Sequence, residues 1–343
     1  MFFPDLNLGW QIAIGITLTW LAVLVNVVTL EVGKWIPNLG AILKVLIFIA
    51  IIVGAIIHVQ DHGMANPLTL ETLTPDWSNS IHYIPAIIYG MLGFELVSAG
   101  SEEMRNPARD VPRSILISGV IILVLYVCGT MAVLAALPAA DINLVEGLID
   151  TLQLFFGGSP AGTVFVTVLG VGALYTFFSN GVTWALGCNR AAAEAALEGE
   201  LPRIFAFENK ALGPPIGAAV LMGIVSTVVL LLYGFLALSN EDLFWSLFTF
   251  SAVIFLLPYL GMLLTFLKLR RTDPLHHRPY RIPGGMPLAR LCAWACFTVL
   301  ALSIVLFVYT PVDGVQWPVL IGVIVTLLFG EGVIRSAEKH RRH

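Results

Sequence analysis

The chain has 343 residues, of which 58% are hydrophobic and only 12% are Asp, Glu, Lys or Arg. Soluble domains carry about 25% charged residues, so a chain of this length with so few charges cannot cover a water-facing surface. The mean hydropathy of +0.89 agrees, and the net charge of -4 offers no basic patch for nucleic acid. Composition therefore argues against a soluble enzyme, a disordered protein or a nucleic-acid binder, and indicates an integral membrane protein.

Nine stretches are long and apolar enough to cross a bilayer, which takes about 20 residues of helix. They lack the alternation of an outer-membrane β-barrel. The sequence therefore predicts an all-α membrane protein, and the fifth stretch is expected to continue to about Leu197. The stretches are 9–30, 37–59, 82–104, 112–137, 161–189, 215–238, 242–269, 287–310 and 315–334.

The charges between these spans divide by sign. If the connections are assigned alternately from an outside N-terminus, the outer ones hold ten acids and no Lys or Arg, whereas the inner ones hold nearly all the Lys and Arg. Basic residues are retained on the cytoplasmic side. We therefore expect a multi-pass protein of the cell membrane with its N-terminus outside and its C-terminus inside, where residues 335–343 form a short basic tail.

The third span combines glycines with a charge. Gly90, Gly93 and Gly100 weaken the helix, and Glu95 lies near mid-depth, where an ionised side chain costs about 2.5–3.5 kcal/mol on insertion scales. Transporters use helices broken at this depth to hold charged substrates. The alternative is a protonated or paired Glu95 that only fixes packing, and the coincidence of glycine and glutamate favours the functional interpretation.

An acidic and basic turn follows, in which Glu102 and Glu103 precede Arg105 and Arg109. It is either a solvated loop or a set of ion pairs that opens and closes an inner gate. Lys44 lies well inside the second span. A lysine held away from water can exchange protons near neutral pH, although Lys44 is also close enough to the inner end to snorkel to the surface.

Catalytic motifs are missing from the sequence. It contains no Gly-rich phosphate loop, nucleophile elbow or HExxH motif. The four cysteines all fall within spans, and the seven histidines have no ligand spacing. The sequence therefore predicts no enzyme, no cofactor and no metal site.

Three collinear segments resemble amino-acid permeases of the amino acid–polyamine–organocation superfamily. Gly93-Phe94-Glu95, the acidic pair and the Arg105 to Arg113 turn resemble the sixth-helix signature of that family. Residues 184–202 resemble its eighth helix and the following loop, and residues 280–285 resemble the loop between its tenth and eleventh helices. The nearest resemblance is to glutamate/GABA-antiporter-like permeases.

This resemblance implies the LeuT-like fold of two inverted five-helix repeats plus two helices, with this chain matching helices four to twelve. It implies alternating-access transport of an amino acid, with protons or a counter-transported amino acid as coupling partner. The implied substrate-binding residues are Tyr89, Gly90, Gly93, Phe94, Glu95, Trp184 and Ser251. The implied proton-coupling residues are Lys44 and Glu95, and the implied gating loop comprises Glu102, Glu103, Arg105 and Arg109.

Residues 1–343 are expected to form a single transmembrane permease domain that lacks the first three helices of the family. Those helices carry the Gly-rich break that in the family binds the substrate's carboxylate and amino groups. The alternative function is therefore a truncated remnant that does not transport, or a membrane protein that binds a partner. A channel is a weaker third option, because no polar repeat or ring of charges supports one.

Overall fold

Helices make up nearly all of the computed structural model. It describes residues 7–28, 35–67, 69–70, 74, 80–81, 83–142, 147–208, 216–237, 239–276, 278, 280–310 and 314–341. Within these ranges the side chains of residues 99–103, 140, 240–241 and 340–341 are not described. The described residues belong to two units, which are treated separately: Met1–Leu73, Ile122–Glu241 and Gly332–His343 form unit 1, and Thr74–Ile121 with Asp242–Glu331 form unit 2.

Eight of the helices are long and apolar enough to cross a membrane. They correspond to eight of the nine predicted spans, and the remaining span, 82–104, is interrupted. The eight are α1 (Leu8–Val28), α3 (Trp35–His62), α7 (Pro107–Ala136), α9 (Pro160–Leu197), α10 (Ile216–Leu236), α11 (Asn240–Thr272), α12 (Gly285–Val308) and α13 (Trp317–Arg341). The all-α membrane fold is thus confirmed.

Two of these helices have ends that bear on the sequence predictions. The extension of the fifth span to Leu197 is confirmed by α9, whose N-cap Ser159 accepts a hydrogen bond from the Gly162 N–H at 3.0 Å. The predicted basic tail begins inside α13, because this helix continues to Arg341.

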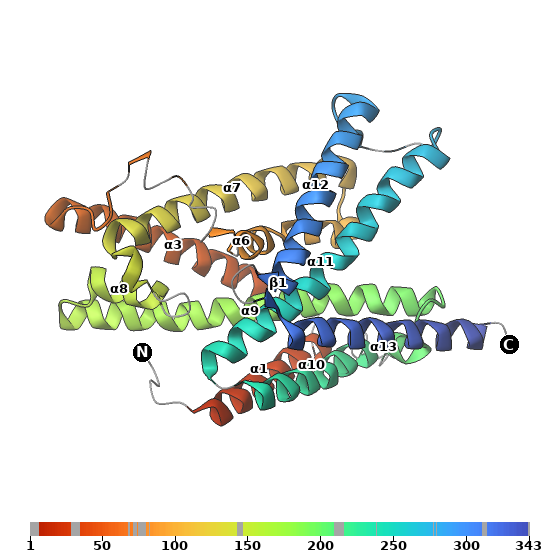
Figure 1. The fold of residues 1–343 in the computed structure, drawn as a ribbon, viewed down its shortest axis with the longest axis horizontal. Helices are drawn as coiled ribbons and strands as arrows, with labels where there is room; N and C mark the ends of the chain where they lie inside the picture. The colour runs from red at the N-terminus through yellow and green to blue at the C-terminus, as the bar shows by residue number, and fades with distance from the viewer. Residues whose placement is uncertain are drawn as a thin grey trace. The chain divides into compact units, whose positions relative to one another are not determined.

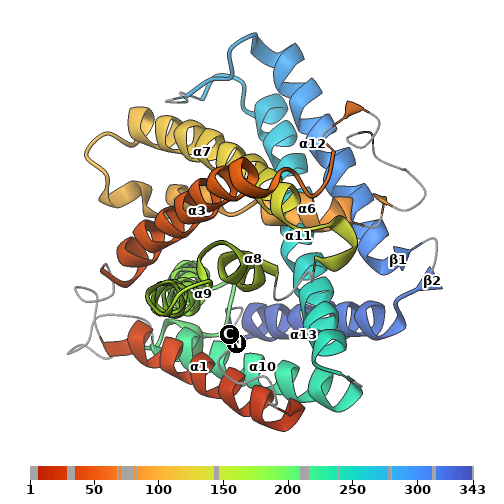
Figure 2. The ribbon, with the colours of Figure 1, turned by 90° about the vertical axis from the view of Figure 1, so that its left-hand side faces the viewer.

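Unit 1 is built on two helix pairs, α3 with α9 and α1 with α10 (Figure 1). In the view of Figure 2, α9 is seen nearly end-on beside α8 (Gly147–Phe156), which packs on both α9 and α3. Small residues allow this close approach: Gly40 of α3 lies against Ser179 of α9, and Gly54 of α3 lies against Phe155 of α8. The Ser179 hydroxyl also donates a hydrogen bond to the Ile36 carbonyl at 2.9 Å.

The core of unit 1 is aliphatic. Its buried members come from α3, α7, α8 and α9, and they are Ile47, Ile51, Ala55, Ala132, Leu152, Val166 and Ala173. The short helices η2 (Ala139–Asp141) and η3 (Arg203–Ala206) complete the unit, and η3 packs on α9 and α10.

Unit 2 contains the interrupted span. Its first segment holds α6 (Ile84–Gly90), the 3-10 helix η1 (Phe94–Glu103) and the first part of α7. Its second segment holds most of α11, the whole of α12, and α13 as far as Glu331. Helix α6 packs on α12. A short antiparallel hairpin pairs β1 (Tyr309–Thr310) with β2 (Gly314–Val315) between α12 and α13.

Candidate substrate site at the interrupted helix

The interruption lies where the sequence places its glycines. Helix α6 begins with Pro85 in its first turn, a position where proline's missing N–H costs nothing, and it ends at Gly90. Gly93 then has φ +106°, a conformation that residues with a Cβ rarely adopt. The chain resumes as η1 with a bond from the Leu96 N–H to the Gly93 carbonyl at 3.2 Å. The predicted break in the third span is therefore present, and a glycine makes it possible.

Glu95 joins this break to α11. Its Oε2 accepts a hydrogen bond from the backbone N–H of Gly93 at 2.8 Å, and its Oε1 accepts one from the hydroxyl of Tyr259. Both groups donate to oxygens of the same carboxyl group. One side chain thus satisfies a backbone group that the break leaves without a helical partner and ties it to a neighbouring helix.

Aromatic rings extend this contact along α11. The Tyr89 ring meets Phe248 and Phe255 edge-on, with centroid distances of 5.2 and 5.5 Å. The Phe255 ring in turn lies 5.1 Å from that of Tyr259. Edge-to-face pairs at these separations are each worth about 0.5–1.5 kcal/mol beyond their buried area. Tyr89 therefore holds α6 to α11, and Glu95 holds η1 to the same helix.

Only some of the predicted substrate residues of unit 2 take part in this contact. Phe94 faces α7, since a Cβ added at Gly119 would lie 3.7 Å from the Phe94 ring. Gly90 is exposed at the end of α6. Ser251 is exposed on α11, where its hydroxyl donates to the Phe248 carbonyl at 2.9 Å. The structure thus brings Tyr89, Gly93 and Glu95 together with α11.

Trp184 and Lys44 belong to unit 1. Trp184 is half-buried on α9, between the buried residues Val182 and Ala185. Lys44 is exposed on α3, one turn after Gly40. The roles predicted for both residues stay predictions.

The predicted gating loop begins in η1. Glu102 and Glu103 are the last residues of η1, and the structure does not describe their side chains. Arg105 and Arg109 are exposed on either side of the α7 N-terminus. The ion pairs predicted for this loop stay a prediction.

Three aromatic residues of α11 were not singled out as site residues by the sequence analysis: Phe248, Phe255 and Tyr259. Their spacing of seven and then four residues places them along one face of a helix. That spacing was available in the sequence, but an apolar span contains many such aromatic sets, and only the contacts with Tyr89 and Glu95 distinguish this one. Among the described residues, no group of three or more His, Cys, Asp or Glu side chains could hold a metal ion.

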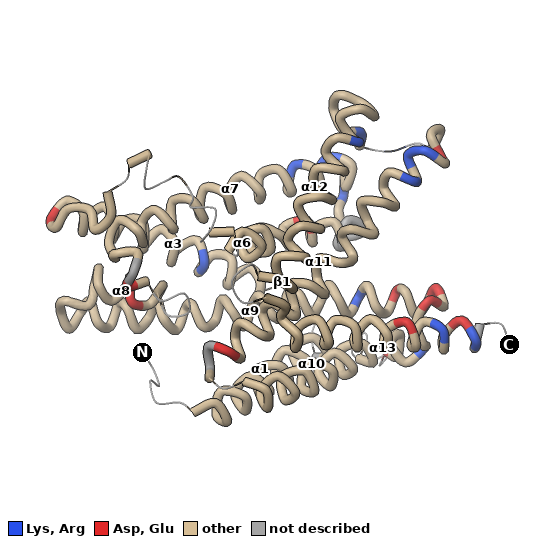
Figure 3. The backbone as a smooth tube through the Cα atoms, viewed as in Figure 1, with Lys and Arg blue, Asp and Glu red and all other residues tan. Residues whose placement is uncertain are grey.

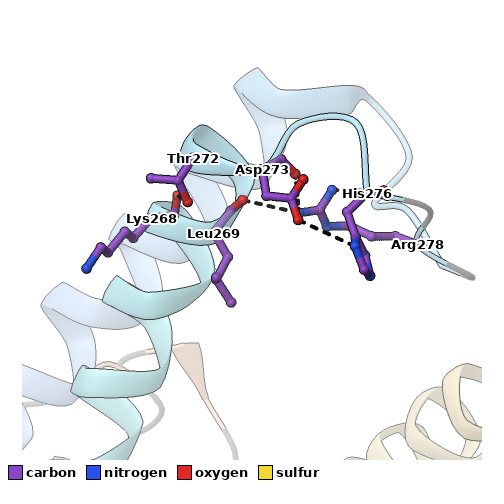
Figure 4. Close-up of polar contacts among 6 residues, drawn as sticks. All are labelled: Lys268, Leu269, Thr272, Asp273, His276 and Arg278. Carbon is purple, nitrogen blue, oxygen red and sulfur yellow. Dashed lines mark hydrogen bonds and ion pairs between the residues drawn. The ribbon is translucent and has the colours of Figure 1, made fainter.

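The loop after α11 is held to the end of that helix by Arg278 (Figure 4). Its guanidinium donates hydrogen bonds to the carbonyls of Leu269, Asp273 and His276 at 3.1, 2.7 and 3.1 Å. A cation is favourable at a helix C-terminus, where backbone carbonyls lack partners. Arg278 therefore fixes where this loop turns back towards α12.

The sequence model of the amino acid permease family matches residues 1–329. The chain belongs to this family of membrane transporters. A probable agmatine/putrescine antiporter of Lactococcus lactis is 31% identical over 342 residues, which are 98% of this chain and 72% of that protein. A glutamate/gamma-aminobutyrate antiporter of the same organism is 24% identical, over 64% of this chain and 44% of that protein.

Other members of the permease family match over most of the chain. An uncharacterised transporter of Legionella pneumophila is 28% identical, over 81% of this chain and 60% of its own length. A D-serine/D-alanine/glycine transporter of Escherichia coli K12 is 23% identical, over 89% of this chain and 65% of its own length. The chain therefore spans between about two fifths and three quarters of the length of these relatives.

Proposed function

We propose that this permease carries out secondary transport of amino acids or of the amines derived from them, and that its substrate binds at the interruption between α6 and η1. The observation that carries the site is the double engagement of Glu95, by Gly93 within the break and by Tyr259 of α11. The family and the names of its relatives support the substrate class.

The charge of the site favours an amine. The first N–H of the break is already used by Glu95, so this end of η1 is not an open position for a substrate carboxylate. A carboxylate flanked by aromatic rings suits a cation, which interacts both with the charge and with the faces of Tyr and Phe rings. In this proposal the amino group of the substrate faces Glu95 and Tyr89.

Transport would proceed by alternating access, with Glu95 as the coupling residue. When a proton or the substrate's cation engages the carboxylate, the bonds to Gly93 and Tyr259 weaken, and the break becomes free to change its angle. Gly90, Phe94 and Ser251 would border the bound substrate, and Trp184 keeps the substrate-binding role that the family resemblance implies. Lys44 would provide a second proton-exchanging group. Binding of a counter-substrate would follow release of the transported substrate and return the site to the first side of the membrane.

The orientation proposed from the charges places the N-terminus outside and the C-terminus in the cytoplasm. The segment that contains Glu102, Glu103, Arg105 and Arg109 then lies at the inner surface, where ion pairs between its acids and arginines would close the inner gate. Cysteine labelling from either side of the membrane tests this orientation. The transport assays do not depend on it.

Exchange in proteoliposomes tests the function. The purified protein is reconstituted in vesicles loaded with putrescine, glutamate, GABA or glycine, and uptake of labelled agmatine, putrescine, glutamate or glycine is followed. We expect counter-substrate-dependent uptake of at least one amine or amino acid, and at least tenfold slower exchange for Glu95→Gln. No uptake of any pair would overturn the proposed function. Robust uptake that Glu95→Gln leaves unchanged would overturn only the role of Glu95.

A further inference from the structure

Unit 2 has a surface pocket of about 660 Å³ at the start of α7. Its walls are almost wholly apolar, and Tyr280 of the loop after α11 contributes to them. The residues that matter here are Pro107, Ala108, Val111, Ile115, Leu116 and Tyr280. An apolar hollow of this kind at a membrane protein's surface has the size and lining to hold a hydrocarbon chain.

The pocket crosses the expected edge of the hydrocarbon layer. Residues 114–136 of α7 contain no charge, whereas Arg105, Arg109 and Arg113 precede them. At 1.5 Å per residue, the wall from Pro107 to Leu116 spans about 14 Å along the helix. One end of the pocket thus lies beside the arginines, and the other lies beside the exposed apolar residues Leu116 and Ile117.

Two arginines lie on the face of α7 that borders the pocket at Leu116, although neither of them is itself a lining residue. Arg109, Arg113 and Leu116 have the spacing i, i+4, i+7, so they share one face of the helix. Both arginines are exposed, and neither has an ion-pair partner among the side chains that the structure describes. On this stretch of α7 the acid is Asp110, which is half-buried.

The second wall of the pocket adds further positive charge. Tyr280 lies in the segment 268–290, which contains six Lys or Arg and a single Asp. Figure 3 shows these basic residues at the end of α11 and the start of α12, on the same side of unit 2 as the start of α7. The polar end of the pocket therefore lies in a basic environment, even though Glu102 and Glu103 precede α7.

We propose that this pocket binds an anionic phospholipid, with an acyl chain along the apolar walls and the phosphate at Arg109 and Arg113. Guanidinium groups bind phosphate oxygens through paired hydrogen bonds, and basic pockets between membrane helices favour acidic head groups. The apolar walls favour a phospholipid over free phosphate, because free phosphate has no hydrocarbon group to contact them. The proposal shares Arg109 with the proposed inner gate, but it requires only that the chain spans a membrane, and lipid binding is measured without transport.

Native mass spectrometry of the detergent-purified protein tests the proposal, with phosphatidylglycerol and phosphatidylcholine of identical acyl chains as probes. We expect phosphatidylglycerol to bind more tightly. The double variant Arg109→Gln/Arg113→Gln should bind it roughly 30-fold more weakly, the equivalent of about 2 kcal/mol at about 1 kcal/mol per arginine, while its binding of phosphatidylcholine stays the same. The matched control, Arg203→Gln/Lys339→Gln, removes two exposed basic residues from unit 1 and should change neither.

A second variant tests the pocket itself. Ala108→Trp fills the apolar wall and should reduce the binding of both lipids, whereas Ile117→Trp, at an exposed apolar position one residue beyond the pocket wall, should not. Equal binding of the two lipids, or unchanged phosphatidylglycerol binding in the double arginine variant, would overturn the proposal. Loss of a protein dimer in Ala108→Trp, without loss of lipid, would assign the pocket to a second copy of the chain instead.

Discussion

Replacing Tyr259 with Phe removes a single hydroxyl from the candidate site and leaves the ring in place. The ring keeps its contact with Phe255 at 5.1 Å, so packing changes little. What is lost is the hydrogen bond to Glu95 Oε1, while the bond from Gly93 to Oε2 stays. The variant therefore isolates the link between the break and α11.

The size of the effect follows from the kind of bond. A hydrogen bond to a charged group contributes about 1.5–3 kcal/mol. Because Glu95 and Tyr259 are both half-exposed within unit 2, water replaces part of the lost bond, and we expect about 1.5–2 kcal/mol. If the bond exists in only one state of the transport cycle, losing it shifts the balance between states by roughly 10- to 30-fold.

Two assays measure this effect: the exchange rate in proteoliposomes and the unfolding temperature of the purified protein in detergent. Tyr309→Phe, a change of the same kind at an exposed tyrosine of unit 2, is the control and should match the wild type. A double-mutant cycle with Glu95→Gln should give a coupling energy of about 1–2 kcal/mol. If the two single effects add to within about 0.5 kcal/mol, Tyr259 and Glu95 do not interact directly and the reasoning is refuted.

Two glycines give further predictions. Gly93→Ala forces a side chain into a φ of +106° and should cost about 1–3 kcal/mol, seen as a lower unfolding temperature, whereas Gly261→Ala on α11, where an added Cβ meets nothing within 4 Å, should be neutral or slightly stabilising. Gly40→Ala places a Cβ 2.6 Å from the Cβ of Ser179. This overpacking should cost about 1–3 kcal/mol of unfolding free energy and lower the unfolding temperature; the control is Gly181→Ala on α9, which has open space around it. A wild-type unfolding temperature in Gly93→Ala would contradict the positive φ of Gly93. The same result in Gly40→Ala would contradict the close approach of Gly40 to Ser179.

The spans could be predicted from sequence because the physics behind them is local. A run of about 20 apolar residues has few alternatives in a bilayer, and α9 ends at Leu197 as the Ala-rich extension predicts. The interruption was equally local, since glycine at 90 and 93 marks the place where the helix fails. Its details were not: Glu95 lies only two residues from Gly93, but its other partner, Tyr259, is 164 residues away.

The aromatic face of α11 shows why such partners escape a sequence analysis. Phe248, Phe255 and Tyr259 have helical spacing, yet membrane helices carry aromatic residues on every side for contact with lipid. Choosing the side that faces Tyr89 needs the relative rotation of two helices, which depends on packing rather than on composition. Ser251, predicted from the resemblance, is exposed and bonded to its own helix, so its predicted contact with substrate depends on the same rotation.

Lys44 presents two alternatives that helical phase alone does not separate. On α3 the buried residues Gly40, Ile47 and Ile51 form one stripe, and at 100° per residue Lys44 falls within that stripe although its side chain is exposed. A lysine that only snorkels would be expected on the opposite side of the helix. The backbone of Lys44 thus lies on the packed face of α3 while its side chain is exposed, so both the proton-exchange and the snorkelling interpretations stay open.

Lys44→Arg separates these interpretations, because arginine keeps the charge and the ability to snorkel but does not release its proton. If Lys44 exchanges protons during transport, the variant should lose the pH dependence of exchange and slow at least tenfold, while Lys268→Arg in the last turns of α11 keeps the wild-type profile. If Lys44 only snorkels, Lys44→Arg should transport like the wild type at every pH. A wild-type pH profile in Lys44→Arg would thus remove Lys44 from the coupling mechanism and leave Glu95 as its proposed centre.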